Sequence, residues 1–264
     1  MERGWCGILL ALVLAGTGCS AGARSPAGNG FPADPVFDYQ LGGAYPPADG
    51  VTVVVRDGGA EPAPGHYNVC YVNAFQTQPD DRDRWLTGHP DLVLRDRAGE
   101  PLVDEDWPDE MILDTTHAAE LAELVAPDLR RCADAGFDAV ELDNLDSYLR
   151  SAGALTIEDN LALAEALVAV ADEEGLAAGQ KNTVELGTRG RDEAGFDFAV
   201  VEECVPHDEC ARYAEVYGGR VLPVEYTDDW PTPADACADA LPATIVRDRD
   251  LVPAGEPGHV HLRC

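Results

Sequence analysis

The chain has 264 residues, and its 49 acidic residues outnumber its 18 lysines and arginines to give a formal net charge of −31. Such an acidic surface repels nucleic acid and anionic lipid headgroups, so we expect no nucleic-acid partner. The charge by itself fits a cationic partner and a merely well-solvated surface equally well. Beyond the amino-terminal segment, no apolar run approaches the ~20 residues that a membrane-spanning helix requires.

The first 18 residues have the pattern of an export signal: a charged start, a short apolar run at 8–14, and small residues up to Gly18. Cys19 follows directly, which resembles a bacterial lipoprotein cleavage site, so Cys19 is predicted to carry lipid once residues 1–18 are removed. Ordinary cleavage nearby is the alternative. Residues 19–36, rich in Gly, Ala and Ser, are predicted to form a flexible tether. We therefore expect an extracytoplasmic protein that contacts the membrane only through this anchor, or a secreted one.

Residues 37–264 are predicted to form one domain in which parallel strands alternate with helices. Strands are predicted at 37–41, 51–56, 68–73, 137–143, 176–181, 196–202, 220–226 and 243–247, and helices at 116–135, 158–174, 207–217 and 232–240. Eight strands in roughly 210 residues favour a single (β/α)8 TIM-type barrel over a doubly wound sheet. The region 74–115 lacks clear periodicity and is interpreted as a lid or a substrate wall.

Six cysteines remain once Cys6 and Cys19 are set aside, an even number in a chain that meets an oxidising compartment. Up to three disulfides are expected, although the sequence alone does not choose among the pairings. Cys204 with Cys210 is the favoured local bridge, and Cys237 with Cys264 would hold the carboxyl end.

Polar residues gather where the later predicted strands end. In a barrel, these strand ends open onto the face where the chemistry takes place. Lys181 is the only lysine of the chain, and three of its six asparagines fall at these ends. The strand-end residues are Asn73, Glu141, Asp143, Asn144, Lys181, Asn182, Glu202, Glu203, Glu225 and Tyr226.

Other kinds of catalytic site do not fit the residues present. None of the four serines lies in a GxSxG turn, and the sequence has no phosphate loop or dinucleotide fingerprint. His259 and His261 form an HxH pattern without an identifiable third ligand, and a solvated tail is the favoured interpretation. A metal site at the cysteines is disfavoured because no CxxC occurs. We therefore predict neither metal nor cofactor, which leaves carboxylate chemistry.

Asp143 and Glu202 end the fourth and sixth predicted strands, with Lys181 at the end of the strand between them. Paired carboxylates suit glycosidic cleavage, since one protonates the leaving oxygen while the other attacks the anomeric carbon or activates water. A neighbouring cation keeps an aspartate ionised, so Asp143 is the predicted nucleophile. Glu202 follows Val200 and Val201, and an apolar approach favours the acid/base role. With one intervening strand, the pair is expected to be close enough for a retaining reaction.

At this point the sequence resembles glycoside hydrolase family 114, the endo-α-1,4-polygalactosaminidases. The matching segments are 37–41, 70–71, 136–148, 180–182, 196–204 and 225–226. The resemblance implies a (β/α)8 barrel that cuts within chains of α-1,4-linked galactosamine, a cationic polymer, with Asp143 and Glu202 as the catalytic pair. The candidate substrate-binding residues are Asp38, Tyr71, Asn73, Glu141, Asn144, Lys181, Asn182, Glu203, Glu225 and Tyr226.

Several positions depart from the family pattern, among them Leu142, Val201 and Glu203. Because such positions border the expected substrate subsites, hydrolysis of another amino-sugar polymer stays open as an alternative. A second alternative is a non-catalytic carbohydrate-binding barrel. The joint presence of Asp143, Lys181 and Glu202 argues against it.

Overall fold

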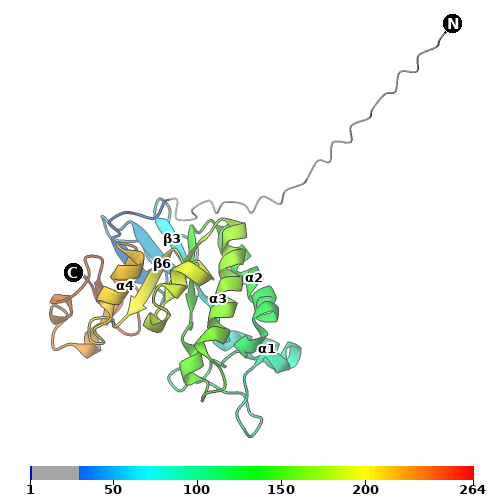
Figure 1. The fold of residues 1–264 in the computed structure, drawn as a ribbon. Helices are drawn as coiled ribbons and strands as arrows, with labels where there is room; N and C mark the ends of the chain where they lie inside the picture. The colour runs from blue at the N-terminus through cyan, green and yellow to red at the C-terminus, as the bar shows by residue number, and fades with distance from the viewer. Residues whose placement is uncertain (2–29) are drawn as a thin grey trace.

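The computed structural model describes Met1 and residues 30–264 (Figure 1). The described strands form one sheet in which neighbours along the chain are neighbours in space, parallel from β1 to β8 and antiparallel between β8 and β9. The eight predicted strands are all present, and β9 was not predicted. The strands are β1 Phe37–Gln40, β2 Val53–Asp57, β3 Tyr67–Asn73, β4 Ala139–Asp143, β5 Ala177–Lys181, β6 Phe198–Glu202, β7 Val221–Tyr226, β8 Ile245–Arg247 and β9 His261–Arg263.

The described α-helices are α1 Arg82–Gly88, α2 Ala118–Ala135, α3 Ile157–Glu174 and α4 Cys210–Tyr217. The long helices α2 and α3 lie side by side against the sheet (Figure 1). The capping box that starts α3 has the Thr156 side chain accepting from the Asp159 backbone N–H, while the Asp159 side chain accepts from the Thr156 N–H. Gly175 ends the same helix with a φ of 78°.

The predicted helix at 232–240 is wrong. The structure has only a 3₁₀ turn at Asp235–Cys237. The segment lies between Pro231 and Pro242 and contains Pro233, and so short a stretch is marginal as a helix unless an apolar face packs against the core. Instead, the Asp235 carboxylate accepts from the backbone N–H of Thr232 at 2.9 Å, which favours a turn.

Alternation along the strands separates the two largest clusters of the core. Side chains inside the barrel include Tyr39, Val69, Ala139, Phe198 and Val224. The alternate positions of the same strands face the helices, as with Leu142 and Val201. This two-residue period explains why Glu141 and Asp143 point the same way as Ala139, toward the barrel interior.

The sheet closes into a barrel through side chains of its last strands. The Arg247 guanidinium of β8 donates to the carbonyl of Tyr39 in β1, and also to the carbonyls of Val252 at 3.1 Å and Val260 at 2.8 Å. The His261 ring of β9 lies 3.3 Å from the carbonyl of Phe37. His261 therefore begins a strand, and the His259 ring lies 2.6 Å from the carbonyl of Val252, so the HxH segment is not the solvated tail that the sequence suggested.

The region 74–115 contains structure that the sequence did not predict. Besides α1, it folds back on itself through isolated antiparallel bridges, for example between Gln76 and Ile112 and between Val103 and Met111. Met111, Ile112 and Leu113 are buried, so this excursion packs against the barrel wall.

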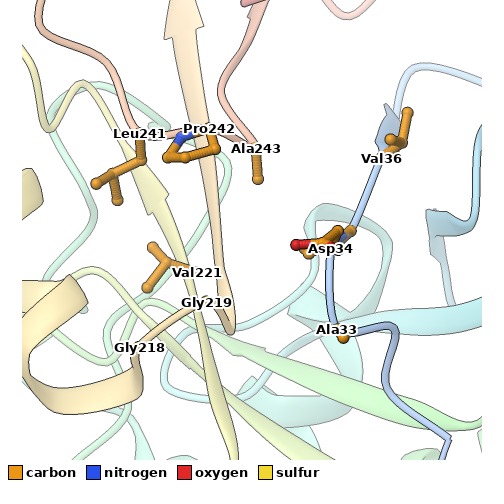
Figure 2. Close-up of a pocket in the computed structure, with 10 residues that line it drawn as sticks. Ala33, Asp34, Val36, Gly218, Gly219, Val221, Leu241, Pro242 and Ala243 are labelled. Atoms are coloured by element: carbon orange, nitrogen blue, oxygen red, sulfur yellow. The ribbon is translucent and has the colours of Figure 1, made fainter.

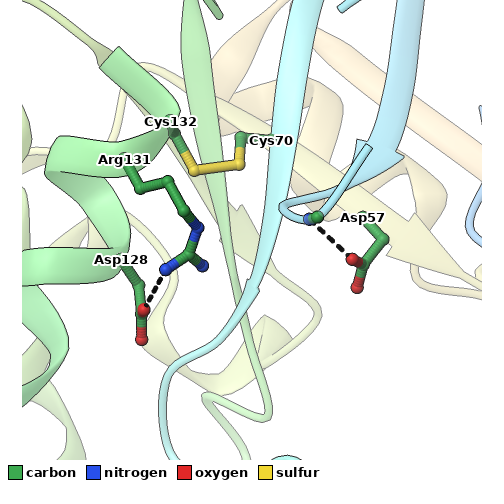
Figure 3. The surroundings of a disulfide bond; sticks show 6 residues. Asp57, Cys70, Asp128, Arg131 and Cys132 are labelled. Carbon is green, nitrogen blue, oxygen red and sulfur yellow. Dashed lines mark hydrogen bonds and ion pairs between the residues drawn. A yellow bond between two sulfur atoms is a disulfide. The ribbon is translucent and has the colours of Figure 1, made fainter. Parts of the chain in front are cut away.

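Three disulfides join the six cysteines of the domain. Cys204–Cys210 and Cys237–Cys264 match the favoured pairings, and the remaining bridge is Cys70–Cys132. This third bridge ties β3 to α2, and Arg131, which precedes Cys132, forms an ion pair with Asp128 one turn earlier in the helix (Figure 3).

Among the described residues, no helix is both long and apolar enough to cross a membrane. The predicted export signal and the lipid-bearing Cys19 lie outside the described residues. Both stay predictions.

Candidate active site

A cleft of about 840 Å³ opens at the carboxyl ends of the strands. The last residues of three consecutive strands, Asp143, Lys181 and Glu202, meet at its floor, and Tyr226 from the end of β7 joins them. Eight acidic and three basic side chains line the cleft, so it favours a cationic ligand. These charged residues are Asp57, Asp106, Glu110, Asp143, Asp146, Glu202, Glu203 and Asp250, with Arg150, Lys181 and Arg249.

Asp143 is held in its ionised form. Its Oδ1 lies 2.8 Å from the Lys181 ammonium, and its Oδ2 accepts from the Tyr71 hydroxyl and, at 3.4 Å, from the Asn144 amide. Burial by itself would raise the pKa of this carboxyl, but the charge and hydrogen bond of Lys181, together with Tyr71, bring the pKa below its ordinary value. A low pKa suits a nucleophile or an electrostatic stabiliser.

Glu202 has a more open setting, with 24 % of its side chain exposed against 15 % for Asp143. The Tyr226 hydroxyl donates to Glu202 Oε1, and the Asn182 amide donates to Oε2 at 3.4 Å. The sequence suggested an apolar approach to Glu202, but its carboxylate lies among polar groups. Val201 instead points outward into the core under the helices.

Lys181 lies among three carboxylates, with its side chain only 4 % exposed. Its ammonium is 2.9 Å from Glu141 Oε1, 2.8 Å from Asp143 Oδ1 and 3.2 Å from Glu202 Oε2. Burial opposes its charge, but the three carboxylates raise its pKa well above the usual value, so Lys181 stays an ammonium. The two oxygens of Asp143 and Glu202 that share this ammonium therefore lie no more than about 6 Å apart.

Glu141 lies beneath this pair and has no exposed surface. Its Oε1 accepts from the Tyr39 hydroxyl at 2.8 Å, while its Oε2 is buried without a partner among the described residues. Burial raises the pKa of Glu141 to about 7, although Lys181 acts in the opposite direction. Glu141 therefore supports Lys181 from below and cannot touch a substrate in this arrangement.

The residues that directly follow the three strand ends have left-handed backbones. The φ angles are 64° at Asn144, 44° at Asn182 and 56° at Glu203. Asparagine tolerates this conformation better than most residues, which gives a physical reason for asparagines at these positions. Glu203 is held there by its backbone N–H bond to Val224 at 2.9 Å and by its ion pair with Arg249 at 3.0 Å. The turns redirect the chain while each preceding side chain points into the cleft.

Most of the predicted substrate-binding residues lie at the cleft. Tyr71, Asn144, Asn182, Glu203 and Tyr226 line it along with Lys181. Asn73 lies just behind, where its amide donates to Glu110 Oε2 at 2.8 Å.

Two predicted residues lie elsewhere, because their strand positions face away from the barrel interior. Asp38 is 1 % exposed and accepts from the Tyr45 hydroxyl at 2.6 Å. Glu225 is fully buried and accepts from the backbone N–H of Val205 at 3.0 Å. Neither residue lines the cleft.

The structure adds residues that the sequence reasoning missed. The Tyr39 ring lies against the Lys181 ammonium, and its hydroxyl donates to Glu141. Tyr39 follows Phe37 by two residues in β1, so the sequence could have predicted that its side chain points into the barrel. Trp107 and Glu110 enter the cleft from the 74–115 excursion, whose path no periodicity indicated. Arg249 stacks on the Tyr226 ring at 4.2 Å.

A second cavity, of about 220 Å³, opens at the opposite end of β7, beside Val221 (Figure 2). Its walls are apolar apart from Asp34. It lacks the paired groups that acid–base chemistry needs. Among the described side chains of the types that can bind a metal ion, Cys204, Cys210 and Glu225 come close together. The two cysteine sulfurs are bonded to each other in a disulfide, so they do not form a metal site.

Comparisons with known proteins agree with this geometry. The family model described as "Glycoside-hydrolase family GH114" matches residues 19–264. Aspergillus fumigatus Ega3, solved in complex with galactosamine, is similar with a TM-score of 0.71 and 20% identity, over 88% of this chain and 96% of that one. The glycoside hydrolase domain of PelA from Pseudomonas aeruginosa has a TM-score of 0.61 and 17% identity, over 84% and 96%. No curated protein sequence matches.

Proposed function

Because this chain belongs to glycoside-hydrolase family GH114 and is a glycoside hydrolase, we propose that it cuts within chains of α-1,4-linked galactosamine, with Asp143 and Glu202 as its catalytic carboxylates. The observation that carries the proposal is the Lys181-bridged pair at the floor of an acidic cleft. A structural neighbour solved with galactosamine supports this choice of sugar.

In this mechanism Asp143 attacks the anomeric carbon, since Lys181 and Tyr71 keep it ionised. Glu202 protonates the leaving oxygen and then activates water, because it is the more exposed of the two and faces the open cleft. Retaining glycosidases place their carboxyl groups ~5–5.5 Å apart, and inverting ones ~6.5–9.5 Å apart. The upper limit of about 6 Å between the Lys181-bound oxygens supports retention.

The acidic cleft supports the substrate class. Galactosamine units carry ammonium groups when they are not acetylated, and the eight lining carboxylates outnumber the three lining cations. The three disulfides suit an oxidising, extracytoplasmic compartment, where an extracellular polymer would be met. Lipid attachment at Cys19 would keep the enzyme at the membrane and belongs to the same proposal.

The test is product analysis on partly deacetylated α-1,4-galactosamine polymer, beside other amino-sugar polymers. Early release of mixed oligomers is expected from internal cutting, and monomer alone would contradict it. Proton NMR of the first-formed ends should show α-anomers, and β-anomers would overturn retention. Cleavage of only another amino-sugar polymer would reassign the substrate.

Variants assign the two carboxylates. Asp143→Asn and Glu202→Gln should each lower turnover by ~10² or more, because each removes the ionisable group and preserves shape. Asp134→Asn and Glu215→Gln make the same exchanges at exposed positions of α2 and α4, and should leave activity unchanged. More than about a tenth of the activity in either cleft variant would remove that residue from its role.

A further inference from the structure

One turn of the 74–115 excursion carries an unusual pair of residues into the cleft. Trp107 is 64 % exposed, among the most exposed large apolar side chains described, and it lines the cleft. Glu110 lines the same wall three residues later. An exposed indole leaves a large apolar surface in contact with water, which is unfavourable. Its position at a cleft therefore indicates that a ligand covers it.

The turn is held in place by a buried acid. Asp104 is 2 % exposed, and its Oδ1 accepts from the backbone N–H groups of Asp106 at 2.9 Å and Trp107 at 3.4 Å. Its Oδ2 lies 2.7 Å from Arg150 and 2.8 Å from the Gln76 amide. These contacts set the backbone under Trp107 before any ligand arrives.

Glu110 is fixed at the strand ends and lacks a cationic partner. Its Oε2 accepts from Asn73 at 2.8 Å and lies 3.5 Å from the amide of Asn144, the residue next to Asp143. Within residues 30–264, no basic side chain forms an ion pair with it, whereas Glu203 across the cleft is paired with Arg249.

Burial, together with the charges of Asp143 and Asp104, raises the pKa of Glu110 to about 7, although the Asn73 hydrogen bond and the Arg150 charge act to lower it. An arriving ammonium would relieve this cost of ionisation.

We propose that Trp107 and Glu110 form a subsite for a galactosamine unit next to the one being cleaved, with the sugar ring against the indole and its ammonium paired with Glu110. The pairing would be a charge-assisted hydrogen bond, which an acetylated amino group cannot supply. The subsite therefore selects unacetylated units, while Trp107 contributes apolar contact to either kind of unit. This inference rests on the proposed function for its choice of sugar.

The experiment measures binding, so that it does not depend on catalysis. Calorimetric titration uses short α-1,4-galactosamine oligomers, free or fully N-acetylated, with Glu202→Gln as the parent protein to prevent cleavage. Glu110→Gln should weaken binding of the free oligomer about tenfold and leave the acetylated one within about twofold. Trp107→Ala should weaken both. Glu105→Gln and Leu149→Ala, at exposed positions outside the cleft lining, are the matched controls and should match the parent.

The subsite would be overturned if Glu110→Gln bound the free oligomer as tightly as the parent does, or lost affinity for both oligomers equally. It would also be overturned if Trp107→Ala bound both oligomers as tightly as the parent does, or if the parent bound neither oligomer. Unchanged melting temperatures exclude misfolding as the cause of a loss. Product release by the wild-type protein is followed separately. Selective binding without hydrolysis would support the subsite and contradict the proposed reaction, whereas hydrolysis with an unaffected Glu110→Gln would contradict the subsite alone.

Discussion

Lys181 shows how much one residue of an otherwise lysine-free chain can organise. Its ammonium is buried with three carboxylates, and removing it would leave those acids uncompensated in the barrel interior. Its rarity and its position at a strand end indicated a special role and predicted that it lies at the substrate cleft. The structure places it at the cleft floor, where it sets the charge state of Asp143 and forms an ion pair with Glu202.

Glu225 offers a residue-scale test outside the cleft. Burial raises its pKa to about 7, so the folded state holds a proton that the unfolded chain releases near its ordinary pKa of ~4.3. The stability from this proton is present below the unfolded pKa and is lost as the pH rises to about 7. The Glu225→Gln variant does not lose this stability at high pH. Its free energy of unfolding relative to the wild type should therefore be higher at pH 8 than at pH 5, by roughly 1–3 kcal/mol.

Urea denaturation of both proteins at the two pH values measures this difference. Glu215→Gln, the same exchange at an exposed position of α4, is the control. A Glu225→Gln effect that is equal at both pH values would contradict the raised pKa.

At the scale of elements, the strands were predictable and the long connection between β3 and β4 was not. Each strand is marked by a short run of apolar residues, which can be seen directly in the sequence. The 74–115 excursion is instead held by distant contacts, such as Gln76 to Asp104 and Asn73 to Glu110. Helix α3 was predictable in the same way as the strands, since its caps at Thr156 and Gly175 depend on residues that are close in sequence.

The disulfides test how elements are tied together. Cys70–Cys132 closes a loop 62 residues long, and Cys204–Cys210 closes one of 6. Loop-closure entropy gives about 4 kcal/mol for the first and about 2 kcal/mol for the second. Replacing both cysteines of Cys70–Cys132 with alanine should therefore cost about 2 kcal/mol more unfolding free energy than the same change at Cys204–Cys210. Urea unfolding under matched conditions measures both losses, and a larger loss at the short loop would contradict the entropic account.

At the scale of the whole molecule, the net charge of −31 and the acidic cleft act together on a cationic polymer. Salt screens such attraction, and the screening length falls from ~10 Å at ~0.1 M to ~3 Å at ~1 M. We expect kcat/KM for deacetylated polymer to fall roughly threefold or more between ~50 and ~500 mM NaCl. The acetylated polymer, measured in parallel, should show little change. A salt response of equal size for the two polymers would exclude charge steering.

The sequence by itself indicated the alternation of strands and helices and the strand-end positions of Asp143, Lys181 and Glu202, because apolar runs and turns are local. It favoured two of the disulfide pairings without fixing them. The tertiary structure decided which strand-end residues share one space. A two-residue period sends Asp143 inward and Glu225 outward, and only the closed barrel shows which side is the cleft. It also brought Trp107 and Glu110 beside the carboxylate pair, through contacts between residues more than thirty positions apart in the chain.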